Sequence, residues 1–137
     1  MDLLTKARVE DVAAIVRYWA EDRADMGKED DLTGWCAKAS AKLFKQLQQQ
    51  GIAAEIHVWV HAASPESHVY LVVDSHVVDV TATQFRQFRN TPVLIMHERE
   101  AQAYEFYHTT LVFHSVEALR KWQKKERWPF DQIALPH

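Results

Sequence analysis

Hydrophobic residues recur along this chain with two different periods, and each period predicts a type of element. Between positions 5 and 26 they return every three or four residues, which predicts an amphipathic helix. The apolar stripe of this helix comprises Val9, Val12, Ala13, Ile15, Val16 and Trp19. The same spacing predicts a last helix over about 116–125, with Ser115 as its cap.

A second helix is predicted before Gly51, and it carries the only cysteine of the chain. We expect it to begin at about Thr33 or Gly34, with Asp31 or Thr33 as its cap, and to stop at Gly51. Cys36 then lies in its first turn. The residues behind Cys36 are small enough for close packing against a sheet, and they are Ala37, Ala39, Ser40 and Ala41.

From Ile52 the period becomes two, which predicts a half-buried strand. One face of that strand comprises Ile52, Ala54, Ile56, Val58 and Val60. Further strands are predicted at 68–73, 76–82 and 93–97, and within 104–113. The whole pattern indicates an α+β fold, with helices packed on one antiparallel sheet.

The strands at 68–73 and 76–82 place a histidine and an aspartate close together. If positions 74 and 75 form a two-residue turn, His68 and Asp79 are diagonal neighbours on one face, typically about 7–8 Å apart at the backbone. An odd register would place Asp79 on the opposite face. We expect the helix that carries Cys36 to pack on the face that His68 and Asp79 share.

Composition narrows the class of protein. The chain has 137 residues, one domain in length, with 47% hydrophobic and 26% charged residues, as in ordinary globular proteins. Its net charge of -3 offers no basic footprint, so no nucleic-acid partner is expected. The sequence has no long apolar run, so neither a signal peptide nor a membrane partner is expected, although leaderless export stays open. A single cysteine cannot form an internal disulfide, and we expect a free thiol in the cytoplasm.

The three residues Cys36, His68 and Asp79 fit the roles of a thiol enzyme. A helix N-terminus and a nearby imidazolium both favour the reactive thiolate form of a cysteine. His68 would take the thiol proton, and Asp79 would orient the imidazole ring and stabilise its charged form. Two alternatives stay open, because a lone cysteine is often a small buried hydrophobe and Asp79 could be a surface carboxylate.

The same residues carry a resemblance to a known family. Gly34-Trp35-Cys36 with its small helix, the strand from Gly51, His68-Val-Tyr and Asp79-Val-Thr together resemble the transglutaminase-like and papain-like cysteine enzymes. The resemblance implies a single domain over 1–137 with a papain-like core, in which a nucleophile helix packs on an antiparallel sheet between N- and C-terminal helices. It also implies Cys36 as nucleophile, His68 as base and Asp79 as orienting residue. Valine replaces the family's proline after Asp79, and no tryptophan follows Cys36, which leaves the subfamily open.

These inferences predict an enzyme that acts on an amide or acyl bond through a thioester, on a protein or peptide substrate, without a cofactor. Peptidase, amidase, deamidase and transglutaminase activities all remain possible. The backbone N–H of Cys36 is expected to stabilise the oxyanion, and Trp35 and Gln84 are weak candidates for further oxyanion or substrate contacts. The alternatives are a catalytically silent binding or regulatory module and a structural core with an inert thiol.

Other histidines in the sequence suggest two further interpretations. His57-Val-Trp59 also matches the family's histidine element, but it lies on the strand directly after the nucleophile helix, too early in the order. His57 and His61 share a strand face about 13 Å apart, too far for one metal ion, so no metal site is predicted.

Overall fold

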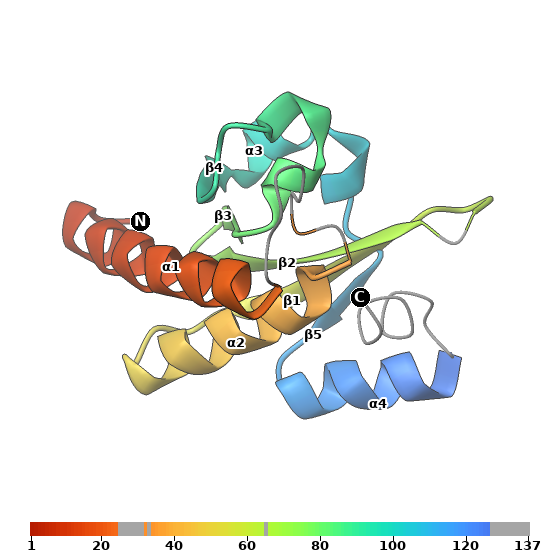
Figure 1. Ribbon diagram of the computed structural model, residues 1–137, viewed down its shortest axis with the longest axis horizontal. Helices are drawn as coiled ribbons and strands as arrows, with labels where there is room; N and C mark the ends of the chain where they lie inside the picture. Colours follow the sequence, from red (N-terminus) through yellow and green to blue (C-terminus); the bar gives the residue numbers. More distant parts are fainter. Residues whose placement is uncertain (25–31, 33, 65, 127–137) are drawn as a thin grey trace.

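The computed structural model describes residues 1–24, 32, 34–64 and 66–126, and these form helices packed on one antiparallel sheet (Figure 1). The α-helices are α1 (Leu3–Ala24), α2 (Cys36–Gln49), α3 (Glu98–Ala101) and α4 (Val116–Glu126). The strands are β1 (Glu55–Val60), β2 (Ser67–Val73), β3 (His76–Asp79), β4 (Leu94–His97) and β5 (Leu111–Phe113). The short 3-10 helices are η1 (Ala82–Gln84), η2 (Arg86–Phe88) and η3 (Glu105–Tyr107). The strand order is β4-β3-β2-β1-β5, so the predicted α+β class is confirmed for the described residues.

The β2–β3 hairpin has the even register that the sequence predicts. Its turn residues Asp74 and Ser75 have φ angles of 48° and 63°, the left-handed conformation of a type I′ turn. Side chains alternate along each strand, so His68 and Asp79 lie on the same face of the sheet. The paired positions are Leu71 with Val78, Val72 with Val77 and Val73 with His76.

The strand β3 ends at Asp79, earlier than the predicted position 82. The Asp79 carboxylate accepts hydrogen bonds at Oδ1 from the Thr81 N–H (2.8 Å) and the Thr81 hydroxyl (3.2 Å). An aspartate that binds the backbone two residues later forms an Asx turn, which bends the chain out of the sheet. The chain therefore leaves the sheet at the residue that faces His68.

The strand β1 begins at Glu55, three residues later than the predicted start at Ile52. The N–H of Ile52 donates to the carbonyl of Leu47, so this segment closes the end of α2 and does not join the sheet. From Glu55 onward the predicted alternation holds. Ile56 packs in the core under the helices, whereas Trp59 packs in the core on the other face.

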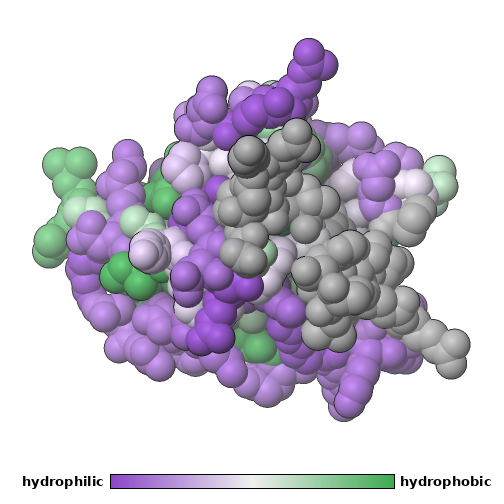
Figure 2. All heavy atoms as spheres, viewed as in Figure 1, coloured by the Kyte–Doolittle hydropathy of each residue, from purple (hydrophilic) through white to green (hydrophobic). Residues whose placement is uncertain are grey.

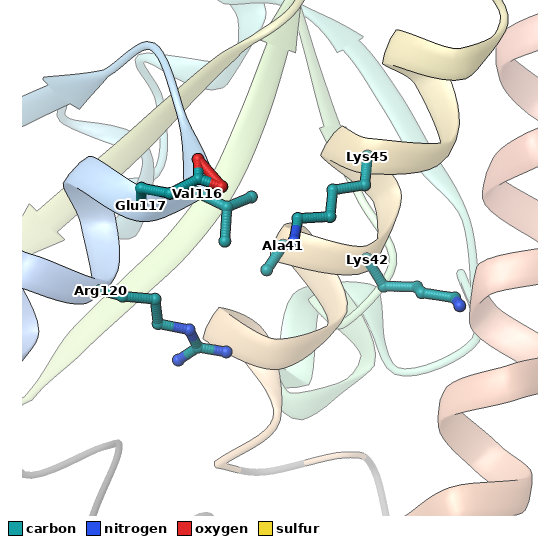
Figure 3. Close-up of a pocket in the computed structure, with 6 residues that line it drawn as sticks. All are labelled: Ala41, Lys42, Lys45, Val116, Glu117 and Arg120. Atoms are coloured by element: carbon teal, nitrogen blue, oxygen red, sulfur yellow. The ribbon is translucent and has the colours of Figure 1, made fainter.

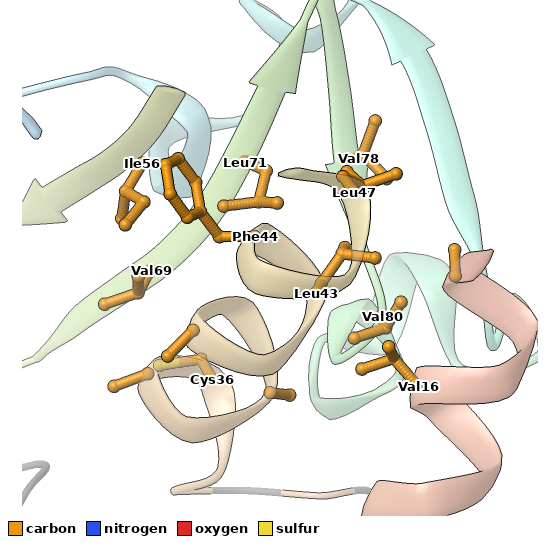
Figure 4. Packing of buried hydrophobic residues seen from close by; sticks show 14 of the residues in the cluster. Val16, Cys36, Leu43, Phe44, Leu47, Ile56, Val69, Leu71, Val78 and Val80 are labelled. Atoms are coloured by element: carbon orange, nitrogen blue, oxygen red, sulfur yellow. The ribbon is translucent and has the colours of Figure 1, made fainter. Parts of the chain in front are cut away.

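The helices α1 and α2 cover the face of the sheet opposite to His68 and Asp79, so the prediction that α2 packs on their face is wrong. Leu43 and Leu47 of α2 pack among aliphatic strand residues (Figure 4). The strand residues of this cluster are Ile56, Val58, Val69, Leu71, Val73 and Val78. Every second strand position is aliphatic here, whereas the other face carries polar groups, so burial of apolar area drives the amphipathic α2 onto this face.

The other face is covered by the chain between β3 and β5, which includes η1, η2, α3 and η3 (Figure 1). Its core is mainly aromatic. The buried members are Trp59, Tyr70, Val72, Val77, Ala82, Phe88, Leu94, Ala101, Phe106 and Tyr107.

Helix α1 differs from its predicted stripe. Ile15 is 65% exposed, whereas Arg17 and Ala20, which are not part of that stripe, are buried, Arg17 with only 7% exposure. The Arg17 guanidinium donates to the Val80 carbonyl (3.0 Å) and the Thr83 hydroxyl (2.7 Å), and it forms an ion pair with Glu21. Because these partners satisfy the charge, α1 buries an arginine where an apolar periodicity would place an aliphatic residue.

The predicted cap of the last helix is confirmed, since the Ser115 hydroxyl accepts from the Ala118 N–H at 3.1 Å. The proposed caps of α2, Asp31 and Thr33, lie outside the described residues. Among the helices that the structure describes, each is too short or too polar to cross a bilayer. The face in Figure 2 is mostly hydrophilic, with hydrophobic atoms at the N-terminal end of α1, where Leu3 and Leu4 are exposed.

Candidate active site

His68 and Asp79 form a buried hydrogen-bonded pair at the end of the hairpin remote from its turn. His68 Nε2 lies 2.7 Å from Asp79 Oδ2, and the two side chains are 0% and 1% exposed. The even register of the hairpin brings them together, as the sequence predicts.

The Asp79 carboxylate accepts hydrogen bonds from Tyr107 and Thr81 in addition to its contact with the His68 imidazole. Oδ2 also accepts a hydrogen bond of 2.5 Å from the Tyr107 hydroxyl, while Oδ1 is occupied by Thr81. Burial alone would raise the pKa of Asp79, but the charge and hydrogen bond of His68, together with Tyr107 and Thr81, lower it below its ordinary value. Asp79 is therefore ionised at neutral pH.

The His68 ring is protonated at neutral pH because the Asp79 carboxylate stabilises its charged form. Burial works to lower the pKa of His68, but the charge and hydrogen bond of Asp79 outweigh it. A hydrogen bond and a charge interaction with the Cys36 side chain also raise this pKa, which reaches about 9. The site thus holds an imidazolium between a carboxylate and a thiol.

Cys36 reaches this pair from the other layer of the molecule. It lies in the first turn of α2, as predicted, although the helix begins at Cys36 itself and not at Thr33 or Gly34, and its side chain is completely buried. The pairing of β2 with β3 ends at Leu71 and Val78, before His68 and Asp79 are reached. Because Nε2 of His68 is occupied by Asp79, Nδ1 is the nitrogen available to the thiol.

Gln84 and Trp35 are the two weak candidates for oxyanion or substrate contacts, and of these Gln84 contacts His68. The Gln84 amide nitrogen lies 3.3 Å from His68 Nδ1 and donates to the Thr81 carbonyl at 3.0 Å. An amide N–H donates only to a neutral ring nitrogen, so this contact is a hydrogen bond once His68 has given up its Nδ1 proton, and not in the imidazolium form. Trp35 is the residue before α2, and its ring packs edge-on against Trp19 with Lys38 above it.

Aromatic rings surround the imidazole of His68 on its own face. Phe85 makes an edge contact with centroids 4.7 Å apart, and Tyr70 stacks at 5.7 Å. Phe85 stacks in turn on Phe106 at 3.7 Å. These rings exclude water from the pair, which strengthens its electrostatic interactions.

The rival histidine, His57, belongs to a separate network. Its Nδ1 lies 2.8 Å from the Thr109 hydroxyl, and its Nε2 lies 3.1 Å from Glu55. The same Thr109 hydroxyl contacts Tyr70 at 2.8 Å. In the part of the chain that the structure describes, no three His, Cys, Asp or Glu side chains are grouped so that they could hold a metal ion.

Sequence reasoning missed two residues that shape the site. Tyr107 lies 28 positions after Asp79 and precedes β5, so no spacing rule links the two. Arg17 belongs to α1, yet it binds the chain just after Asp79 through Val80 and Thr83. In the sequence Arg17 is one of several charged residues of the first helix, so nothing there signals this contact.

A surface pocket of about 430 Å³ lies between α2 and α4, away from these residues (Figure 3). It is lined by Ala41, Lys42, Lys45, Val116, Glu117 and Arg120. Lys42 points toward α1, where its ammonium lies 5.2 Å above the Trp19 ring. The pocket holds neither a buried titratable group nor a nucleophile, so size alone does not make it the site of chemistry.

The chain was compared with known proteins at the level of family, sequence and structure. No family model matches it, and no curated protein or solved structure matches it significantly.

Proposed function

We propose that this protein is a thiol enzyme of the transglutaminase-like and papain-like type, in which Cys36, His68 and Asp79 cleave or transfer an amide or acyl bond. The proposal unites the sequence resemblance with the described α+β fold and the order of the three residues on helix, strand and next strand. Its substrate is a protein or peptide, and no cofactor is required.

In the proposed reaction, Cys36 Sγ attacks the carbonyl carbon of the substrate, and the carbonyl π electrons move to the oxygen. When the oxyanion collapses, the bond to the leaving group breaks, and the leaving group takes a proton from His68 Nδ1. The neutral ring then accepts a proton from water or an amine, which attacks the thioester and expels the Cys36 thiolate. Asp79 keeps Nε2 protonated, so that Nδ1 is the nitrogen that exchanges protons.

The observation that carries the proposal is the shared imidazole. One ring is hydrogen-bonded through Nε2 to a buried carboxylate at 2.7 Å and also interacts with the side chain of the only cysteine. A structural core gains little from burying a cysteine, a histidine and an aspartate in one network. Activation of a nucleophile explains the arrangement.

One observation favours the alternative, a catalytically silent binding module of the same fold. The side chains of Cys36 and His68 are both 0% exposed, so a substrate meets them only after the site opens. Enzymes also open closed sites through loop motion, so burial alone does not distinguish an enzyme from a silent binding module. A measurement of the reactivity of Cys36 does.

The test is alkylation of Cys36 by iodoacetamide as a function of pH. A thiol of ordinary acidity loses about two orders of magnitude in rate between pH 8.5 and 6. We expect the parent protein to lose less than about tenfold, because the His68 imidazolium stabilises the thiolate. The ratio of rates at the two pH values does not depend on how often the site opens, provided that opening itself is insensitive to pH.

His68→Ala should restore the ordinary steep pH dependence. The matched control is His57→Ala, which removes the rival ring from the neighbouring strand and should leave the parent profile intact. A steep profile in the parent, or one that is indifferent to His68, would favour the silent module.

A further inference from the structure

One polar atom near the candidate site has no hydrogen-bond partner. The hydroxyl of Ser67 is buried, its residue is 5% exposed, and none of the residues that the structure describes donates to it or accepts from it. Buried polar groups are nearly always paired, because an unpaired one costs free energy. A buried hydroxyl without a partner therefore needs an explanation, and a ligand that enters the site would supply one.

The register of β2 places this hydroxyl on the side of the sheet that α2 covers. Ser67 pairs with Val60, which packs against the core under the helices, and directly paired residues share a face. His68, the next residue, points to the opposite face. The strand therefore offers the imidazole on one side and the unpaired hydroxyl on the other.

The contact between α2 and β2 then locates Ser67 along the helix. The Ser40 hydroxyl donates to the Val69 carbonyl at 3.1 Å, which fixes one point of contact. Cys36 precedes Ser40 by four residues, about 6 Å of helix, and Ser67 precedes Val69 by two residues, about 6.6 Å of strand. The two elements run in the same general direction (Figure 4). From these distances we infer that the Ser67 side chain lies beneath the first turn of α2.

We propose that the Ser67 hydroxyl and the N–H of Cys36 together bind the carbonyl oxygen of an acyl substrate and stabilise the oxyanion formed when Cys36 attacks. The N–H groups of the first helical turn have no intrahelical partner, and the helix dipole favours negative charge there. This inference rests on the proposed function and replaces Gln84 as the second donor, since the Gln84 amide is engaged by Thr81 and His68.

The test uses hydrolysis of p-nitrophenyl acetate by Ser67→Ala and by the matched control Ser40→Ala. Both substitutions remove one hydroxyl from the same helix–sheet interface, but Ser40 already has a partner. Loss of an oxyanion donor should lower the acylation rate of Ser67→Ala by about 10²-fold. Its melting temperature should equal or exceed that of the parent, since a methyl group replaces an unpaired hydroxyl.

Ser40→Ala should show the reverse pattern, with a lower melting temperature and an acylation rate within about twofold of the parent. Iodoacetamide alkylation forms no oxyanion, so its pH profile should be unchanged in Ser67→Ala. Parent-like ester acylation in Ser67→Ala, with the alkylation profile intact, would overturn this inference alone. An ordinary alkylation profile in the parent, or no acylation of it by the ester, would overturn the proposed function and this inference with it.

Discussion

The two faces of the central sheet are both buried, but they are built from different chemistry. The face under α1 and α2 is lined by Val, Leu and Ile side chains, whose packing requires only complementary shape. The other face combines aromatic rings with a hydrogen-bonded group of His68, Asp79 and Tyr107. Hydrogen bonds are directional, so the aromatic face fixes the orientation of an imidazole ring. The aliphatic face, in contrast, fixes only the position of a helix.

Cys36 links the two faces. It is part of the apolar core under the helices, yet its side chain interacts with His68 of the other face. Under the proposed function, the aliphatic face supplies most of the stability and the aromatic face most of the reactivity. Three substitutions and one titration test this division.

Asp79→Asn should have the largest effect, a loss of about 10³–10⁴ in ester turnover with the fold retained, because an amide stabilises the wrong tautomer of His68. Hydrolysis of p-nitrophenyl acetate and circular dichroism measure the two properties. The control is Asp74→Asn on the turn of the same hairpin, where the carboxylate is exposed and pairs with the N-terminus. If Asp79→Asn retained turnover within about twofold of the parent, Asp79 would have no part in the chemistry.

Leu71→Ala removes a buried side chain from the aliphatic face and should lower the free energy of unfolding by about 2–5 kcal/mol. Leu71 is fully buried beneath α2, so the substitution leaves a cavity. Urea denaturation gives the stability. The alkylation profile of the folded fraction should match the parent, and a profile like that of His68→Ala would mean that the two faces are not separable.

Tyr107→Phe should have a smaller effect that depends on pH. The Tyr107 hydroxyl donates to the Asp79 carboxylate and lowers the pKa of that group, so its removal should cost about 1.5–3 kcal/mol at pH 7. Asp79 adds stability above its pKa in the unfolded chain and loses it as pH falls through the folded value. The difference between variant and parent should therefore shrink in acid, and a constant difference would point to lost packing alone.

An effect of similar size should appear when the parent is titrated from pH 6.5 to 9. The pKa of His68 is raised from 6.5 to about 9, so its contribution to stability is complete below 6.5 and is lost as pH rises through 9. Urea denaturation should show a lower free energy of unfolding at pH 9 than at 6.5. The decline should be shallower in Asp79→Asn, which lacks the charge that raises this pKa. An equal slope in both proteins would assign the decline to other groups.

Much of the site was predictable because it depends on local rules. A two-residue turn at Asp74 and Ser75 fixes the register, and the register alone puts His68 and Asp79 on one face. The place of Cys36 in the first helical turn follows from the helical periodicity after it. Errors arose where a side chain overrode the periodicity, as when the Asp79 Asx turn ended β3 early and when the paired Arg17 entered the core.

By itself, then, the sequence determined the elements, the hairpin register and the pairing of His68 with Asp79, because each depends on residues close in the chain. Only the tertiary structure decided which face of the sheet α2 covers, since alternation along a strand distinguishes two faces without saying which one a helix will choose. Aliphatic burial made that choice and placed the helix of Cys36 across the sheet from His68. The contacts of Tyr107 with Asp79 and of Ser40 with Val69 were likewise decided by packing, because they join residues 28 and 29 positions apart.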